Sequence, residues 1–283
     1  MKPFQARIAI ALAVLVVTAS GCSVINRIRS KNELNEAART YREGRYVEAE
    51  EHSRKALELD PESKAAPLFI ARTIHAQYRP GVAAPENIAK AREAIEAYRQ
   101  ILQNDPQNEE AYRAIAFLYE RIKEDGKLRE WIIARANDSG AEPEKRAEAY
   151  IVLASKDWNC SFQITDLPTN KVTTVSEGKA TVSYKKPKEQ KDFDSAQMCV
   201  KRGLEEVENA LKFDPNSEPA WSYKTNLLIE ASKLAEMDGK TDQKAELDKQ
   251  REAAQKRTDQ LSDANRKKQA EEEAKKAASP PSS

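Results

Sequence analysis

Residues 44–61 have the sequence GRYVEAEEHSRKALELDP, in which an Asp-Pro pair follows an amphipathic stretch rich in alanine, leucine and glutamate. Proline cannot continue a helix and disfavours the α conformation of the residue before it, so Asp60-Pro61 predicts a helix end. The same pair ends two later segments, at Asp105-Pro106 and Asp214-Pro215, and a short polar stretch follows each time. A motif that recurs at helix ends indicates helices arranged in repeats.

Bulky and small residues recur at fixed positions of the predicted helices. In the segment 109–122, Tyr112, Ile115 and Tyr119 lie on one face, because they are three or four positions apart. The eighth position of each first helix holds a small residue, which lets the paired helix pack closely. These small residues are Ala37, Ala71, Ala116, Ala154 and Thr225.

This pattern, together with the bulky Tyr112 and Trp221 at the fourth position, resembles the tetratricopeptide repeat (TPR), a helix–turn–helix unit. The resemblance implies an all-α fold, a TPR-type solenoid of antiparallel helix pairs with about five repeats over residues 30–261. The repeats begin near residues 30, 64, 109, 144 and 218, and the second contains an insertion around residues 79–86.

Residues 159–191 split the fourth repeat. Val172–Val175 and Ala180–Tyr184 are rich in β-branched residues and flank a turn that contains Gly178. We therefore expect a small β-hairpin insertion in repeat four.

Cys160 and Cys199 bracket the predicted hairpin. In an exported protein, an even pair of cysteines favours a disulfide bond. The alternative is two unrelated buried thiols.

The N-terminus has the organisation of a bacterial lipoprotein signal. Basic residues precede an apolar run from Ile8 to Val17, and small residues lead into Cys22. This resembles a lipobox and implies a signal peptide over residues 1–21 and lipidation, including palmitate, of Cys22. The alternative is an ordinary signal peptide with a chance cysteine.

The lipobox resemblance also implies a location. Residues 22–29 would be a lipidated tether, and the protein would be lipid-anchored in the cell envelope. Ser23 stands where aspartate would be the familiar inner-membrane retention signal, so the resemblance implies the outer membrane, facing the periplasm.

Residues 262–283 are predicted to form a charged, partly disordered C-terminal tail. Before it, Ala254 and Leu261 belong to a thin apolar stripe. We expect this stripe to cap the end of the solenoid up to about Leu261. The alternatives are a solvated single helix or a weak coiled coil.

Composition limits the function classes. Lys and Arg (47) nearly cancel Asp and Glu (46), so the chain has no large basic field for nucleic-acid binding. Its two histidines, His52 and His75, have no cysteine or second histidine at metal-ligand spacing, and no glycine-rich phosphate loop is present. We expect no catalytic residue, no metal, no cofactor and no small-molecule substrate.

The TPR resemblance implies a binding groove along the first helices of the repeats. Carrying over the concave positions of the repeat gives a basic and aromatic set, which suits an extended peptide or a partner helix. The predicted groove residues are Tyr41, Arg72, His75, Arg113, Phe117, Trp158 and Asn226. The alternative for Tyr41, Phe117 and Trp158 is packing between repeats.

The expected function is a membrane-anchored protein–protein interaction scaffold, not an enzyme, that binds a partner protein or peptide in its concave groove. One alternative is an enzyme that acts on the cell wall through a site in the hairpin insertion, or an accessory to such an envelope enzyme. Another is a structural spacer or oligomer built through the charged C-terminal helix.

Overall fold

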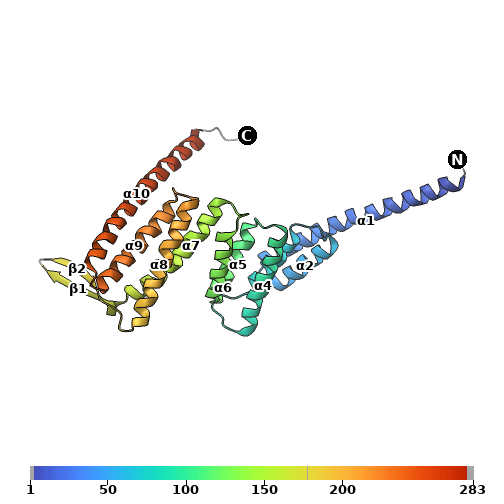
Figure 1. Cartoon of the computed structure of the whole chain (residues 1–283). Coiled ribbons are helices and arrows are strands. Elements are labelled where there is room, and N and C mark those ends of the chain that lie inside the picture. Colours follow the sequence, from blue (N-terminus) through green and yellow to red (C-terminus); the bar gives the residue numbers. More distant parts are fainter. Residues whose placement is uncertain (1–2, 177, 279–283) are drawn as a thin grey trace. The chain divides into compact units, whose positions relative to one another are not determined.

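The computed structural model describes residues 3–176 and 178–278, with the side chains among them except those of residues 3–22, 179 and 276–278 (Figure 1). The helices are paired along the chain, and one two-stranded sheet lies between α7 and α8. The helices are α1 (Pro3–Arg42), α2 (Tyr46–Leu59), α3 (Ala66–Gln77), α4 (Pro85–Asn104), α5 (Glu109–Arg121), α6 (Asp125–Asn137), α7 (Pro143–Thr165), α8 (Gln190–Phe213), α9 (Glu218–Met237) and α10 (Thr241–Ala278). A short 3-10 helix, η1 (Pro168–Asn170), leads into the strands β1 (Lys171–Ser176) and β2 (Lys179–Tyr184).

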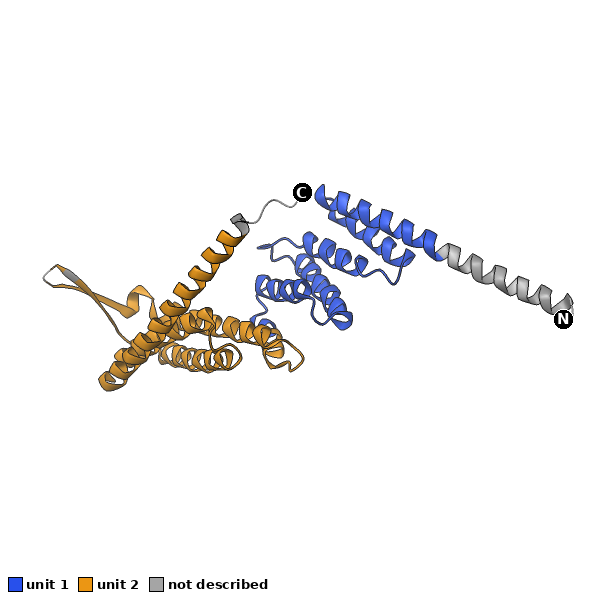
Figure 2. Ribbon diagram, turned by 90° about the horizontal axis from the view of Figure 1, so that it is seen from above, with its two compact units in different colours: residues 1–128 blue, residues 129–283 orange. Residues whose placement is uncertain are grey.

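The predicted fold is confirmed: the chain is all-α and of the TPR type, with a small hairpin. The helix pairs α1/α2, α3/α4, α5/α6, α7/α8 and α9/α10 correspond to the five predicted repeats. The chain divides into two compact units, residues 1–128 and 129–283, and the boundary falls within α6 (Figure 2).

Each Asp-Pro pair ends a helix as predicted. α2, α4 and α8 stop immediately before Asp60, Asp105 and Asp214. The backbone amide of each aspartate still donates to the carbonyl four residues earlier, at 2.9–3.0 Å, and the proline that follows ends the pattern.

The turn after each Asp-Pro pair also starts the next helix. Ser63, Asn108 and Ser217 lie three residues after the aspartates, and each donates its amide to the aspartate carbonyl. Their side-chain oxygens then accept a hydrogen bond from the backbone N–H three residues further on, at 3.2, 3.0 and 3.4 Å. Asn108 and Ser217 are thereby the N-caps of α5 and α9, whereas Ser63 accepts from the first residue of α3 and lies two residues before its N-cap, Ala65. Each bond satisfies an amide that the first turn of a helix leaves unpaired, so one motif both ends and begins a helix.

In unit 1, each helix packs against the next from α1 to α5, and α1 also contacts α3. The close crossings use small residues: Ala37 and Ala71 are fully buried, whereas Ala116 is only half-buried. Gly44 joins α1 to α2 with a φ of +77°, in the left-handed region that glycine adopts without strain.

Residues 22–29, which we expected to be a tether, are helical and lie within α1. The packed part of α1 begins where Ser30 donates its hydroxyl to the carbonyl of Ala56 at 2.8 Å. Arg27 lies on the same turn and pairs with Glu62 at 2.8 Å. Cys22, the predicted lipidation site, has its side chain outside the described residues, as does the apolar run before it. Among the residues whose side chains are described, no helix contains a stretch long and apolar enough to cross a membrane.

In unit 2, α7 packs against α8 and α9, α9 packs against α8 and α10, and β2 lies against α9. Cys160 and Cys199 form a disulfide bond between α7 and α8, with their Cα atoms 6.1 Å apart. The predicted hairpin is present, with Lys171 opposite Tyr184 at its base and Ser176 opposite Lys179 at its turn. The helices reach further into the predicted insertion than expected, since α7 continues to Thr165 and not to Asn159.

A buried polar network explains why α7 continues. The carboxylate of Glu230 on α9 accepts hydrogen bonds from Ser161 at 3.0 Å and Thr165 at 2.5 Å, both in the last turns of α7. Lys233 lies one turn after Glu230 and pairs with it at 2.6 Å. These bonds stabilise the helical conformation of residues 159–165, which their local sequence alone does not favour.

α10 is one helix of 38 residues. Ala254 and Leu261 are buried, as expected for a capping helix, and the described side chains after Leu261 are exposed or half-buried. The predicted tail therefore starts where packing ends, yet its backbone stays helical to Ala278. Residues 279–283 lie outside the described residues.

Candidate functional site

Unit 1 contains a groove of about 910 Å³ that collects five of the seven predicted groove residues. Tyr41 comes from the end of α1, Arg72 and His75 from α3, and Arg113 and Phe117 from α5. Each pair is spaced by three or four residues and so shares one face of its helix. The remaining lining residues are Tyr46, Ala76, Tyr78, Pro80, Tyr98, Glu109, Glu110 and Ala114.

The buried wall of the groove is aromatic. The His75 ring lies 5.9 Å from the ring of Tyr98, edge to face, and 5.7 Å from that of Phe117. His75 Nδ1 and the Tyr98 hydroxyl are 3.4 Å apart. Burial lowers the pKa of His75 and raises the pKa of Tyr98, so both side chains are held neutral.

An ion pair crosses the groove from α3 to α5. The guanidinium of Arg72 donates to both carboxylate oxygens of Glu110, a two-point geometry that fixes both side chains. These hydrogen bonds raise the pKa of Arg72 and lower the pKa of Glu110. The charge of Arg72 is therefore already paired with Glu110 in the wall of the groove.

Arg113 presents its charge to solvent. Its side chain is 71% exposed, and its Nε lies 3.8 Å from the carboxylate of Glu109. Phe117, one turn further along α5, is 38% exposed, and the guanidinium of Arg121 lies 4.8 Å from the centre of its ring. α5 thus offers a cation and an accessible ring side by side.

A smaller groove of about 340 Å³ adjoins the first. Tyr41 and Arg72 line both grooves, and Ala38, Arg42 and Phe69 complete the smaller one. Tyr41 also packs against Tyr46, with ring centres 5.2 Å apart. Because the two grooves share a wall, they form one surface along α1, α3 and α5, which we call the unit 1 groove.

Trp158 and Asn226 do not line the unit 1 groove, since they belong to α7 and α9 of unit 2. Trp158 is half-buried, with its ring centre 5.2 Å from that of Phe162 and 6.2 Å from that of Tyr223. It also packs against the buried cluster of Ala154, Val207 and Leu227. This environment is typical of packing between helices. Asn226 is half-buried on α9.

The sequence pattern missed several groove residues. Tyr98 lies on α4, the second helix of its repeat, whereas the prediction considered first helices alone. Tyr78 and Pro80 come from the insertion between α3 and α4. Asn87 fixes this insertion, because its side chain accepts from the N–H of Arg79 at 2.8 Å and donates to the Arg79 and Val82 carbonyls at 2.8 and 2.7 Å.

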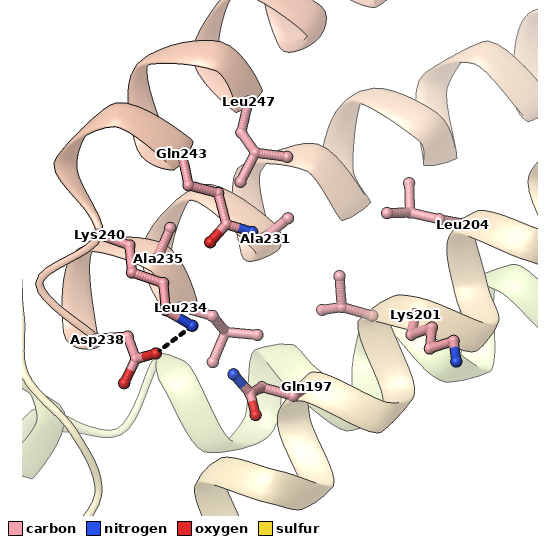
Figure 3. A pocket seen from close by; sticks show the side chains of 11 residues that line it. Gln197, Lys201, Leu204, Ala231, Leu234, Ala235, Asp238, Lys240, Gln243 and Leu247 are labelled. Carbon is pink, nitrogen blue, oxygen red and sulfur yellow. Dashed lines mark ion pairs between the residues drawn. The ribbon is translucent and has the colours of Figure 1, made fainter.

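Unit 2 contains a separate pocket of about 300 Å³ between α8, α9 and α10 (Figure 3). Leu204, Leu234 and Leu247 point into it from the three helices. At its rim Lys240 pairs with Asp238 at 2.6 Å. The lining is mixed, with Gln197, Lys201 and Gln243 among the polar side chains, and Asp238 is its one carboxylate.

The two histidines lie in different surroundings. His52 contacts Glu33 at 2.7 Å on the α1/α2 pair, and His75 is buried among rings. Within the described residues, no three His, Cys, Asp or Glu side chains are grouped so that they could hold a metal ion.

No protein-family model matches the chain, and no curated protein matches it. Among solved structures, it is similar to a TPR repeats protein from Bacteroides fragilis NCTC 9343, with 15% identity over 79% of this chain and 93% of that chain and a TM-score of 0.44. It is also similar to MamA 41-end from Desulfovibrio magneticus RS-1, with 12% identity, coverage of 80% and 96%, and a TM-score of 0.37. A third is the TPR2AB-domain:pHSP90-complex of yeast Sti1, with 17% identity, coverage of 82% and 96%, and a TM-score of 0.27.

Proposed function

We propose that this protein is a membrane-anchored interaction scaffold whose unit 1 groove binds an extended segment of a partner protein or peptide. The observation that carries the proposal is the convergence of Tyr41, Arg72, His75, Arg113 and Phe117 on one groove. Three helices hold these side chains, so the surface exists before the partner arrives. A preformed surface keeps the entropic cost of binding low.

The chemistry of the groove defines the segment that fits. Phe117 and Tyr41 offer partly exposed rings for an apolar or aromatic side chain, and Arg113 offers an exposed guanidinium for a carboxylate. Aromatic residues and arginine are the residue types that dominate binding energy at interfaces. The groove volume of about 910 Å³ accommodates several side chains. We therefore expect a partner segment that alternates apolar and acidic residues.

Site-specific photocrosslinking tests the groove. A photoreactive amino acid at Phe117 should capture a partner in intact cells, and the same amino acid at Gln100, an exposed residue of α4 outside the groove, should not. Arg113→Glu should reduce capture from position 117 by at least about tenfold, because one charge-assisted contact is worth roughly 1.5–3 kcal/mol. Equal capture at both positions would show that the groove does not select the partner.

Membrane anchoring rests on the sequence around Cys22. We propose that signal peptidase II cleaves before this residue and that the lipidated chain lies in the cell envelope, in the outer membrane and facing the periplasm. Exposed apolar residues just after the cysteine support the proposal, because Val24, Ile25 and Ile28 are each more than half exposed on α1. Incorporation of labelled palmitate by the natural chain, but not by Cys22→Ser, is the expected result. Equal labelling of both chains would refute lipidation at Cys22.

A further inference from the structure

The β-hairpin extends away from the helices of unit 2 in both views of the molecule (Figures 1 and 2). At its base Tyr184 packs against the buried cluster that contains Phe193 and Leu234. Towards the turn the side chains are exposed, with Val175 at 74% and Val182 at 46%. The base of the hairpin is therefore anchored, and its outer part has no apolar partner among the described residues.

The register shows which backbone groups point outward. Lys185 donates its amide to Asn170, whereas Tyr184, opposite Lys171, donates its amide to the side chain of Glu236 on α9 at 2.8 Å. In an antiparallel pair, hydrogen-bonded and non-bonded positions alternate along the strands. Thr173 and Val175 on β1, opposite Val182 and Ala180 on β2, therefore direct their amides and carbonyls away from the partner strand.

The two edges of the hairpin differ. The β2 edge begins against α9, where Glu236 already binds the outward amide of Tyr184. Along β1, Thr173 and Val175 are exposed, and no group in the described part of the chain bonds to their outward amides. β1 has no proline and its register shows no bulge, which are two of the devices that block pairing at edge strands.

The segment that carries this edge is cationic. Residues 171–191 contain six lysines and two glutamates, although the whole chain has a net charge of only +1. Lys171 pairs with Asp166, and Lys186 pairs with Asp238. Lys185, Lys188 and Lys191 add further positive charge just after β2. Two such hairpins would repel each other, whereas an acidic strand would be attracted.

We propose that the β1 edge accepts an extended acidic segment of a partner protein as a third strand. Main-chain hydrogen bonds from Thr173 and Val175 would supply the affinity, and the lysines would select for acidic residues. The site is separate from the unit 1 groove and does not depend on it.

Proline substitutions at outward-facing amides test the proposal in the full chain. Val175→Pro removes one amide that the third strand needs, while the β1–β2 hydrogen bonds remain, and edge strands tolerate proline at such positions. Ala180→Pro makes the matched change on the β2 edge. The probe is a synthetic peptide of alternating valine and glutamate, and calorimetric titration measures its affinity. Because this composition also suits the unit 1 groove, all chains, the natural one included, are titrated in an Arg113→Glu background.

The natural chain should bind the peptide, Val175→Pro should weaken binding by at least about tenfold, and Ala180→Pro should leave binding unchanged. Hydrogen exchange at the amides of Thr173 and Val175 should slow when the peptide is present. A peptide whose alternate backbone nitrogens are methylated should not bind, and one with lysine in place of glutamate should bind at least about tenfold more weakly.

The proposal is overturned if the peptide does not bind or if the methylated peptide binds equally well. It is overturned too if both proline variants bind like the natural chain. Two other occupants would replace the proposed one. A concentration-dependent increase in mass that Val175→Pro abolishes would assign the edge to a second copy, and binding of anionic vesicles that Val175→Pro abolishes would assign it to a membrane surface.

Discussion

Lys233→Met removes the cation that lies against the most buried carboxylate of unit 2. The side chains of Glu230 and Lys233 are 1% and 10% exposed, and their charged atoms are 2.6 Å apart. The ammonium of Lys233 also lies 5.2 Å from the ring of Phe162 and 5.0 Å from that of Tyr184. Methionine keeps most of the volume and the contact with both rings, so the substitution isolates the loss of charge.

The expected cost follows from the burial of Glu230. Removing one partner of a buried ion pair leaves an uncompensated charge and costs about 3–5 kcal/mol. Glu230→Gln leaves the Lys233 ammonium, only 10% exposed, without its carboxylate, so it should also cost about 3–5 kcal/mol, although the amide oxygen still accepts from Ser161 and Thr165. The double variant contains neither charge, so it should be more stable than Lys233→Met alone.

Urea unfolding followed by tryptophan fluorescence measures these differences in unit 2. All three tryptophans, Trp131, Trp158 and Trp221, belong to residues 129–283, so the signal does not report on unit 1. With a slope of about 2 kcal/mol per molar urea, Lys233→Met should lower the midpoint by roughly 1.5–2.5 M.

The double-mutant cycle decides whether the two charges compensate each other. A coupling energy of about 2 kcal/mol or more between positions 230 and 233 is expected. If the two single costs instead add to within about 0.5 kcal/mol, the pair is not a compensating unit and the reasoning from burial is wrong.

Three further predictions concern other parts of the chain. Replacing both Cys160 and Cys199 by serine should destabilise unit 2 by up to about 4 kcal/mol in the chain-entropy model, since the bond spans 39 residues; an unchanged urea midpoint would contradict this. His75 should titrate below 6.5 in NMR spectra, and because the folded chain disfavours its protonated form, its contribution to stability should be lost as pH falls below about 6.5; a pKa at or above that value would place the ring in solvent. Deleting residues 262–283 should cost less than about 1 kcal/mol and leave the oligomeric state unchanged, whereas Leu261→Ala should cost about 2 kcal/mol or more; a deletion that separates an oligomer into monomers would favour the spacer alternative.

The helix boundaries that local chemistry fixes could be predicted from sequence. Asp60-Pro61 and its two counterparts end helices by the stereochemistry of proline, which does not depend on distant residues. The end of α7 could not be predicted in this way, because Ser161 and Thr165 stay helical through their bonds to Glu230, which is far away in sequence. The side-chain hydrogen bonds at Ser63, Asn108 and Ser217 carry a local signal that our pattern did not use.

In the candidate site, too, some residues could be predicted from local sequence and others depend on distant contacts. Arg72, His75, Arg113 and Phe117 were found because the TPR resemblance implies which positions of each first helix are concave, and these positions recur with the period of the helix. Tyr98 was missed because its position on a second helix becomes part of the groove only when the two helices pack. Periodicity places a side chain on a face but does not say whether a neighbouring helix covers it.

The tail illustrates a third limit. The described side chains after Leu261 bury little surface, yet the backbone of α10 stays helical to Ala278. Its sequence is rich in alanine, glutamate and lysine, which favour helix without any packing partner. Lack of burial therefore did not imply lack of secondary structure.

The disulfide bond also determines how the chain would carry mechanical load. When the two ends are pulled apart, tension passes from Cys160 to Cys199 through the sulfur atoms and bypasses every residue between them. That bypassed length is roughly 130 Å of extended chain, at about 3.4 Å per residue. The hairpin lies within the shielded loop, so it would bear no tension while helices outside the loop are drawn out. A force–extension curve would lengthen by that amount only after reduction.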